Sequence, residues 1–113
     1  ELAEVVAREH GNIHRSGEFG AAAIMRLLER CDAVRKPQRF AEVLLACECD
    51  ARGRLGLQAQ SYPQRPRLLD ALERALDVPT AELAARAQER GLKGPQIAQA
   101  IHEARVKAVE AGL

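Results

Sequence analysis

The stretch with the densest array of reactive side chains runs from Cys47 to Gly56, with the sequence Cys-Glu-Cys-Asp-Ala-Arg-Gly-Arg-Leu-Gly. It follows an apolar run with helical spacing, so each of its two acids lies four residues before an arginine, Glu48 before Arg52 and Asp50 before Arg54. Such pairs let acids and bases satisfy one another. We therefore predict a rigid corner between two helical halves here rather than an active site. The residues assigned to this corner and to the turn preceding its helix are Asp32, Glu48, Asp50, Gly53, Gly56, Tyr62 and Pro63.

Two further groupings have the residue types of a metal or thiol site. His10 and His14 are four residues apart, and on one continuous helix both rings would face a single metal. Gly11 is expected to end the first helix between them, which favours surface or loop histidines. Cys47 and Cys49 point about 200° apart on a helix, so Cys47 is predicted to lie in the core and Cys49 to be a partly buried neighbour. We expect no catalytic residue and no metal site in this chain.

Anion binding has weaker support. The chain lacks the strand and spacing of a phosphate-binding glycine loop. The turn Gly91-Leu-Lys-Gly94 does place Lys93 directly before a predicted helix, whose N-terminus favours an anion. Net charge is +1, but residues 86 to 107 hold five basic against two acidic side chains. This distribution fits either a basic strip that follows a phosphate backbone or an ordinary solvated surface rich in salt bridges.

Composition favours helices over a sheet. Aromatic residues make up 3% of the chain, so the core must be built from Leu, Ala, Val and Ile. Apolar periodicity, proline and glycine predict helices over residues 2–10, 20–31, 37–51, 68–76, 81–90 and 94–109, with Thr80 capping the fifth. The expected fold is all-α, a compact bundle of about six helices with a C-terminal helical tail. Residues 1–52 form its body, 53–66 a linker loop and 67–113 the tail.

The termini and cysteines bear on the cellular context. No apolar run approaches the length of a membrane span, and no signal peptide is evident. Three cysteines, two of them one residue apart, suit reduced thiols better than a disulfide framework. We expect a cytoplasmic protein without a membrane partner.

The first residue is Glu, and the helical pattern starts without a capping residue, which leads us to expect a piece of a longer protein.

Several motifs in order resemble one enzyme family. Asp32-Ala-Val-Arg-Lys-Pro-Gln-Arg-Phe40, the Cys47–Gly56 stretch, Tyr62-Pro-Gln64 and the ending Gly91-Leu-Lys-Gly-Pro-Gln-Ile97 resemble the C-terminal half of bacterial CCA-adding tRNA nucleotidyltransferases. The match is closest to members that carry an HD phosphohydrolase-type domain. It covers nearly the whole chain from about Ala7.

The resemblance implies a parent enzyme that adds C, C and A to the tRNA 3′ end from CTP and ATP with Mg²⁺. That chemistry belongs to an N-terminal head domain, so this piece would hold no cofactor and would be inactive alone. Its expected partners are tRNA and the head domain in cis, and a homodimer is a further possibility. The residues expected to contact RNA are Arg35, Lys36, Arg39, Arg52, Arg54, Lys93 and Arg105.

Two alternatives stay open. One is a metal-dependent HD-type phosphohydrolase acting on 2′-phosphate or 2′,3′-cyclic phosphate ends, which would need a His-Asp doublet. The family pattern often reads His-Asp at the position of His10-Gly11, and Gly11 departs from it. The other is a purely structural or dimerising helical module, which predicts a concentration-dependent mass and no affinity for RNA.

Overall fold

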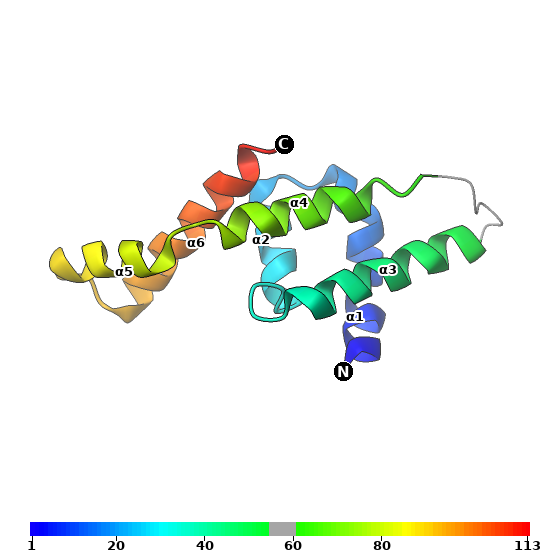
Figure 1. Cartoon of the computed structure of the whole chain (residues 1–113), viewed down its shortest axis with the longest axis horizontal. Coiled ribbons are helices and arrows are strands. Elements are labelled where there is room, and N and C mark those ends of the chain that lie inside the picture. The colour runs from blue at the N-terminus through cyan, green and yellow to red at the C-terminus, as the bar shows by residue number, and fades with distance from the viewer. Residues whose placement is uncertain (55–60) are drawn as a thin grey trace.

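The computed structural model of the chain describes residues 1–54 and 61–113, and the side chain of Arg54 lies outside that description. The described part is all-α, as the sequence predicts (Figure 1). It contains six α-helices and one 3₁₀ turn. The elements are α1 (Leu2–Arg15), η1 (Ser16–Glu18), α2 (Ala21–Arg30), α3 (Pro37–Arg54), α4 (Gln64–Leu76), α5 (Thr80–Glu89) and α6 (Gly94–Glu110).

Helix α1 is longer than its sequence suggests. It continues through Gly11 to Arg15, so the prediction that Gly11 ends the helix is wrong. An interior glycine costs a helix only about 1 kcal/mol. That cost is offset by Ile13, which is fully buried one turn beyond the expected end. The side chain of Ser16 then donates a hydrogen bond to the Ile13 carbonyl at 2.7 Å, where the chain turns into η1.

The turn between α2 and α3 has a defined geometry. Asp32 has a φ of 54°, the left-handed conformation found directly after many helix ends. Its N–H donates to Glu29 O at 3.0 Å, and the N–H of Ala33 donates to Leu28 O at 2.9 Å, which together form a Schellman motif. Pro37 begins α3 as predicted, because a first helical residue needs no N–H donor. The two hydrogen bonds set the angle at which α3 leaves α2.

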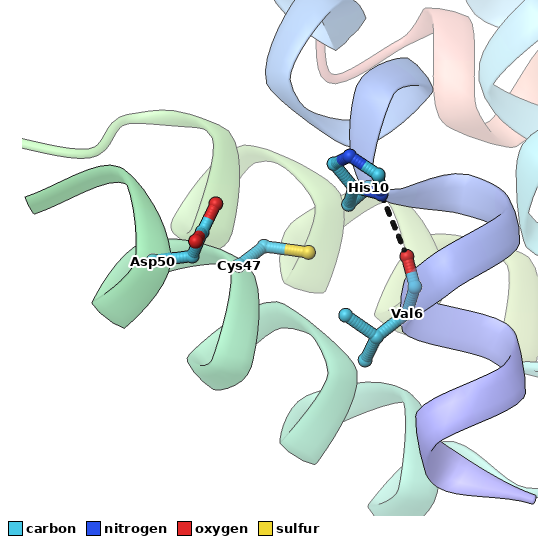
Figure 2. Close-up of a pocket in the computed structure, with 4 residues that line it drawn as sticks. All are labelled: Val6, His10, Cys47 and Asp50. Atoms are coloured by element: carbon cyan, nitrogen blue, oxygen red, sulfur yellow. Dashed lines mark hydrogen bonds between the residues drawn. The ribbon is translucent and has the colours of Figure 1, made fainter. Parts of the chain in front are cut away.

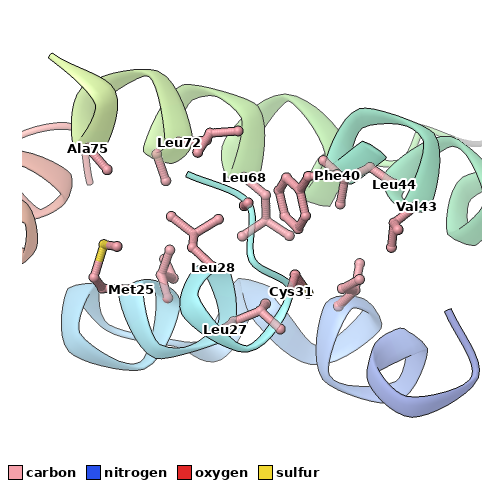
Figure 3. Close-up of a cluster of buried hydrophobic side chains, with 14 of the residues drawn as sticks. Met25, Leu27, Leu28, Cys31, Phe40, Val43, Leu44, Leu68, Leu72 and Ala75 are labelled. Atoms are coloured by element: carbon pink, nitrogen blue, oxygen red, sulfur yellow. The ribbon is translucent and has the colours of Figure 1, made fainter. Parts of the chain in front are cut away.

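The core lies where α2, α3 and α4 meet, with α1 packed against α3 (Figure 3). The predicted inward face of α3 is confirmed, since Phe40, Val43, Leu44 and Cys47 are all fully buried. The same holds for the predicted face of α2. The fully buried residues of largest volume are Phe40, Ile13, Ile24, Met25, Leu27, Leu28, Leu44, Leu68, Val43, Val109, Cys31 and Cys47. Cys49, expected to be partly buried, is exposed because it lies on the opposite side of α3 from Cys47.

Helices extend into the predicted linker range of 53–66 from both sides. Gly53 and Arg54 still belong to α3, and α4 already begins at Gln64. Pro66 lies in the first turn of α4, where backbone N–H groups have no partner within the helix, so a proline is tolerated. Gly56 lies outside the described residues. The division of the chain into a body, a linker and a tail stays a prediction.

Helices α5 and α6 form a hairpin that projects from the rest of the molecule at the left of Figure 1. Its length accounts for principal extents of 56 × 29 × 18 Å. Thr80 is the first residue of α5 rather than its cap, and no side chain caps this helix, because Pro79 takes the flanking position. The C-terminal part of α6 returns to the core and buries Val109, whereas the predicted inward residues Ile97 and Ile101 are half-buried in the hairpin.

No helix among the described residues combines the length and apolar character that a membrane crossing requires.

Candidate nucleic-acid interface

Three of the basic residues expected to contact RNA gather around the turn between α2 and α3. Arg35 pairs with Asp32 at 3.1 Å and is otherwise exposed. Lys36 contacts the carboxylate of Glu1 at 2.6 Å, and Arg39 contacts the same carboxylate. Hydrogen bonds and charge from Lys36, joined by Arg39, hold the pKa of Glu1 below its ordinary value. A second nitrogen of Arg39 donates to Cys31 O at 2.7 Å, so Arg39 also closes the end of α2.

The end of α3 carries the predicted ion pair between Glu48 and Arg52. Their closest side-chain atoms are 3.0 Å apart, which confirms the i,i+4 pairing. Glu48 also accepts from Arg65 of α4 at 3.4 Å, so this carboxylate links α3 to α4. The pair between Asp50 and Arg54 involves a side chain outside the described residues and stays a prediction.

Beside this pair lies a cluster that the sequence analysis missed. The Tyr62 hydroxyl and His14 Nδ1 are 2.7 Å apart, and His14 Nε2 lies 3.7 Å from the Asp50 carboxylate. The rings of His14 and Tyr62 meet edge to face, with centroids 5.8 Å apart. Gln64 donates to the His14 carbonyl at 2.9 Å. The cluster joins α1, α3 and the start of α4.

The expectation that α1 ends at Gly11 concealed this cluster. On the continuous helix His10 and His14 are close neighbours, with ring centroids 5.9 Å apart. Their i,i+4 spacing is the sequence signal for this cluster, and it applies because α1 continues through Gly11. The structure turns His14 toward Tyr62 and Asp50, and His10 Nδ1 lies 3.1 Å from the Val6 carbonyl. Among residues 1–54 and 61–113, no group of three or more His, Cys, Asp or Glu side chains is arranged to hold a metal ion.

A cavity of about 230 Å³ opens between α1 and α3 (Figure 2). Val6 and His10 line it from α1, and Cys47 and Asp50 line it from α3. Burial raises the pKa of Cys47 to about 11, so its thiol stays protonated and unreactive at neutral pH. Burial likewise raises the pKa of Tyr62 above its ordinary value, which keeps its hydroxyl available as a donor.

The tail carries the remaining predicted contacts. Lys93 is exposed at the start of α6, where its backbone N–H donates to Gln96 Oε1 at 2.9 Å. The turn before it is a second Schellman motif, in which Gly91 has a φ of 79° and Leu92 N–H donates to Ala87 O at 3.0 Å. Arg105 lies half-buried on α6, and its Nε is buried without a hydrogen-bond partner.

Several arginines that were not singled out have structural roles. Arg67 of α4 donates to the carbonyls of Ser16 and Phe19, the latter at 3.1 Å. Arg8 donates to the Arg30 carbonyl at 2.8 Å, and Arg30 contacts the buried Glu9 at 3.2 Å. Burial acts to raise the pKa of Glu9, but hydrogen bonds from Asn12, Arg30 and Arg8 outweigh it and hold that pKa below the ordinary value.

The structure therefore brings together one part of the predicted contact set and separates the rest. Arg35, Lys36 and Arg39 share one turn. Arg52 lies thirteen residues after Arg39 on the same helix, about 20 Å away along its axis. Lys93 lies in the turn that joins α5 to α6, directly before Gly94. The contact set is a series of separate points along an elongated molecule rather than a single pocket.

Comparison with known proteins gives consistent matches over nearly the whole chain. The chain is 70% identical over 111 residues, 98% of its length, to the Multifunctional CCA protein of Variovorax paradoxus (strain S110), and covers 26% of that protein. It is 68% identical over 110 residues to the protein of the same name from Paracidovorax citrulli, again covering 26% of it. For Polaromonas naphthalenivorans the identity is 66% over 109 residues. The chain thus spans about a quarter of the length of these relatives. These matches confirm the family resemblance that the motifs indicate.

No protein-family model matches the chain, and no solved structure matches it significantly.

Proposed function

We propose that the chain is one part of a multifunctional CCA protein, and that it is the tRNA-binding and supporting region of an enzyme that adds CCA to the tRNA 3′ end. The observation that carries this proposal is identity of 70% to a multifunctional CCA protein over 98% of the chain. The nucleotide transfer, with its Mg²⁺, CTP and ATP, is assigned to the rest of the polypeptide. On this proposal no residue of this chain takes part in the transfer, and the chain alone has no transferase activity.

The shape and charge of the chain support a role in gripping RNA. A tRNA is long, and contact points separated along an extent of 56 Å suit recognition of a backbone by shape better than recognition of one base. Arg35 and Lys93 are exposed, and Lys93 has no acidic partner among the described contacts. We propose that these two residues and Arg105 carry most of the phosphate contact.

The other predicted contacts are divided between RNA and the fold. Arg39 pairs with the carboxylate of Glu1 and Arg52 with that of Glu48, and Arg39 also donates to the carbonyl at the end of α2. A phosphate would have to compete with these partners. We propose that Lys36, Arg39 and Arg52, with Arg54, contribute less to RNA affinity than Arg35, Lys93 and Arg105 do.

Titration of the chain with tRNA at two salt concentrations tests the proposal. Binding by phosphate contacts releases counterions, so affinity should be measurable at low salt and fall steeply as salt rises. Absence of binding at low salt, or binding that salt does not change, would count against it. A mass that grows with concentration, together with no RNA affinity, would favour a dimerising module instead.

A further inference from the structure

One face of α1 lacks the charged residues that a solvent-facing helix normally carries. The core side of this helix is formed by Val5, Glu9 and Ile13. At about 100° per residue, the side away from the core divides into two sectors. One sector holds the charged side chains of α1. The other holds Ala3, Ala7 and Gly11, and at its border with α3 it includes Val6, His10 and His14, which turn toward α3 and Tyr62. We call this sector the uncharged face.

The uncharged face is partly exposed in the described chain. Ala3 and Ala7 are exposed, and Val6, His10 and Gly11 are half-buried. α1 packs chiefly on α3, and its N-terminal end lies at the bottom of Figure 1, away from the hairpin of α5 and α6. A surface helix of an isolated domain usually has polar and charged residues where these small and apolar residues lie. The pattern instead suits a helix covered on two sides.

Gly11 gives a second reason to expect a partner over the uncharged face. A Cβ built on it would meet only Arg15, at an ordinary 3.9 Å, so nothing in the described chain requires a glycine there. An interior glycine still costs the helix about 0.5–1 kcal/mol relative to alanine. Glycine in a helix is useful where another backbone comes close. The position therefore fits a partner seated over the uncharged face at short range.

The cavity between α1 and α3 adjoins this face. Val6 and His10 belong to both the face and the cavity, and the buried Cys47 lies on the opposite wall (Figure 2). Its volume of about 230 Å³ is enough for one large side chain of a docked element. The uncharged face therefore adjoins a cavity that can accept a side chain from another helix. Helices pack in this way, with the side chains of one fitting into the grooves of the other.

We propose that the uncharged face of α1 and the adjoining cavity are the docking surface for a helix from the remaining part of the multifunctional CCA polypeptide, which places an apolar side chain in the cavity. The inference rests on the proposed function, because it names the surface through which this region supports the rest of the enzyme. About three quarters of the relatives' length lies outside the matched stretch, and this part of the polypeptide can supply the docked helix in cis. RNA is a poor occupant, since the face carries no cation for its phosphates.

The test uses the Variovorax paradoxus relative with its matched stretch replaced by this chain, beside the chain on its own. Ala7→Cys is labelled with a thiol reagent in both proteins, and labelling is followed peptide by peptide. The exposed Cys49 reports on reagent activity in each sample. We expect position 7 to react about tenfold more slowly, or slower still, in the long protein, because a docked helix must open before the reagent enters. Equal rates in the two proteins would overturn the proposal.

Ala85→Cys on α5 is the matched control, since Ala85 is also an exposed alanine inside a helix and should react equally in both proteins. A second variant, Ala7→Arg, should lower the melting temperature of the long protein and leave that of the chain unchanged. A fall in both would mean that position 7 serves the fold of this chain, which also contradicts the proposal. Slow labelling in the isolated chain, with a mass that rises with concentration, would name a second copy as the occupant.

The tRNA titration separates the two proposals. It uses the isolated chain, in which the uncharged face is open, and depends on exposed cations on other elements. Loss of tRNA binding with position 7 still protected in the long protein would refute the RNA role alone. Equal labelling with tRNA binding intact would refute the docking surface alone.

Discussion

Tyr62, the chain's one tyrosine, holds three elements together through a single histidine. His14 has a tyrosine hydroxyl on one ring nitrogen and the Asp50 carboxylate near the other, at 3.7 Å. Since burial raises the pKa of Tyr62, the phenol stays protonated through neutral pH and can donate to Nδ1. In the tautomer in which Nδ1 accepts from the Tyr62 hydroxyl, the ring proton lies on Nε2, on the side of Asp50.

Removing the hydroxyl should cost stability without changing the fold. We expect Tyr62→Phe to lower the free energy of unfolding by about 1 kcal/mol, because a half-buried ring nitrogen loses its partner. Urea unfolding of the wild type, Tyr62→Phe, His14→Ala and the double variant measures the coupling. An interaction energy near zero would show that the 2.7 Å contact between Tyr62 and His14 contributes nothing.

The buried thiols predict a loss of stability at high pH. Burial raises the pKa of Cys31 and of Cys47 from 9.0 to about 11, and both groups return to the ordinary value when the chain unfolds. Their contribution is fully present below pH 9 and is lost as the pH rises toward 11, because the unfolded state releases these protons first. Urea unfolding between these pH values should show the fall, and Cys47→Ala should make it shallower. A pH dependence unchanged by Cys47→Ala would contradict this account.

At the scale of elements, arginine side chains fix the helix ends in this fold. Arg67 reaches from α4 to the carbonyls that end α1 and η1, Arg8 reaches from α1 to the end of α2, and Arg39 reaches the same end from α3. Carbonyls at a helix end lack partners within the helix and carry partial negative charge, so a guanidinium satisfies both needs. These residues belong to the fold, although a count of charges does not distinguish them from arginines that face solvent.

The role of Arg67 can be separated from that of an ordinary surface arginine. We expect Arg67→Ala to destabilise the chain by about 1.5–3 kcal/mol, since two carbonyls lose a charged donor. Arg86→Ala removes an exposed pair with Glu82 on α5 and should cost about 0.5 kcal/mol or less. Thermal unfolding of both variants decides the point, and equal losses would contradict the structural role of Arg67.

The turn between α5 and α6 depends on a left-handed residue. Gly91→Ala should cost about 1 kcal/mol, because its φ of 79° crowds any Cβ, although no neighbouring atom lies within 4 Å of that position. Asp32 already adopts such a conformation in the turn after α2, so Asp32→Gly should be nearly neutral or stabilising. Urea unfolding of the pair tests the strain argument, and a stabilising Gly91→Ala would refute it.

At the scale of the whole molecule, the hairpin of α5 and α6 carries exposed charge away from the core. If it grips tRNA, Lys93→Gln should weaken binding modestly and reduce the salt dependence by about one ionic contact, with stability unchanged. Arg39→Gln should do the reverse, costing stability with a smaller effect on RNA, because Arg39 closes the end of α2. Filter binding with tRNA at several salt concentrations, alongside thermal unfolding, measures both. A Lys93→Gln variant that binds as the wild type would remove the tip from the interface.

The sequence by itself determined the helical class, the inward faces of α2 and α3 and the resemblance to multifunctional CCA proteins, because apolar period, proline position and ordered motifs are local signals. It also predicted the pairing of Glu48 with Arg52, which needs only one continuous helix. Tertiary structure decided what local signals could not. Burial of Ile13 carried α1 through Gly11, and this placed His14 against Tyr62, 48 residues away in the chain. Which arginines hold helix ends and which face solvent likewise depends on neighbours distant in sequence, since the same guanidinium serves either role.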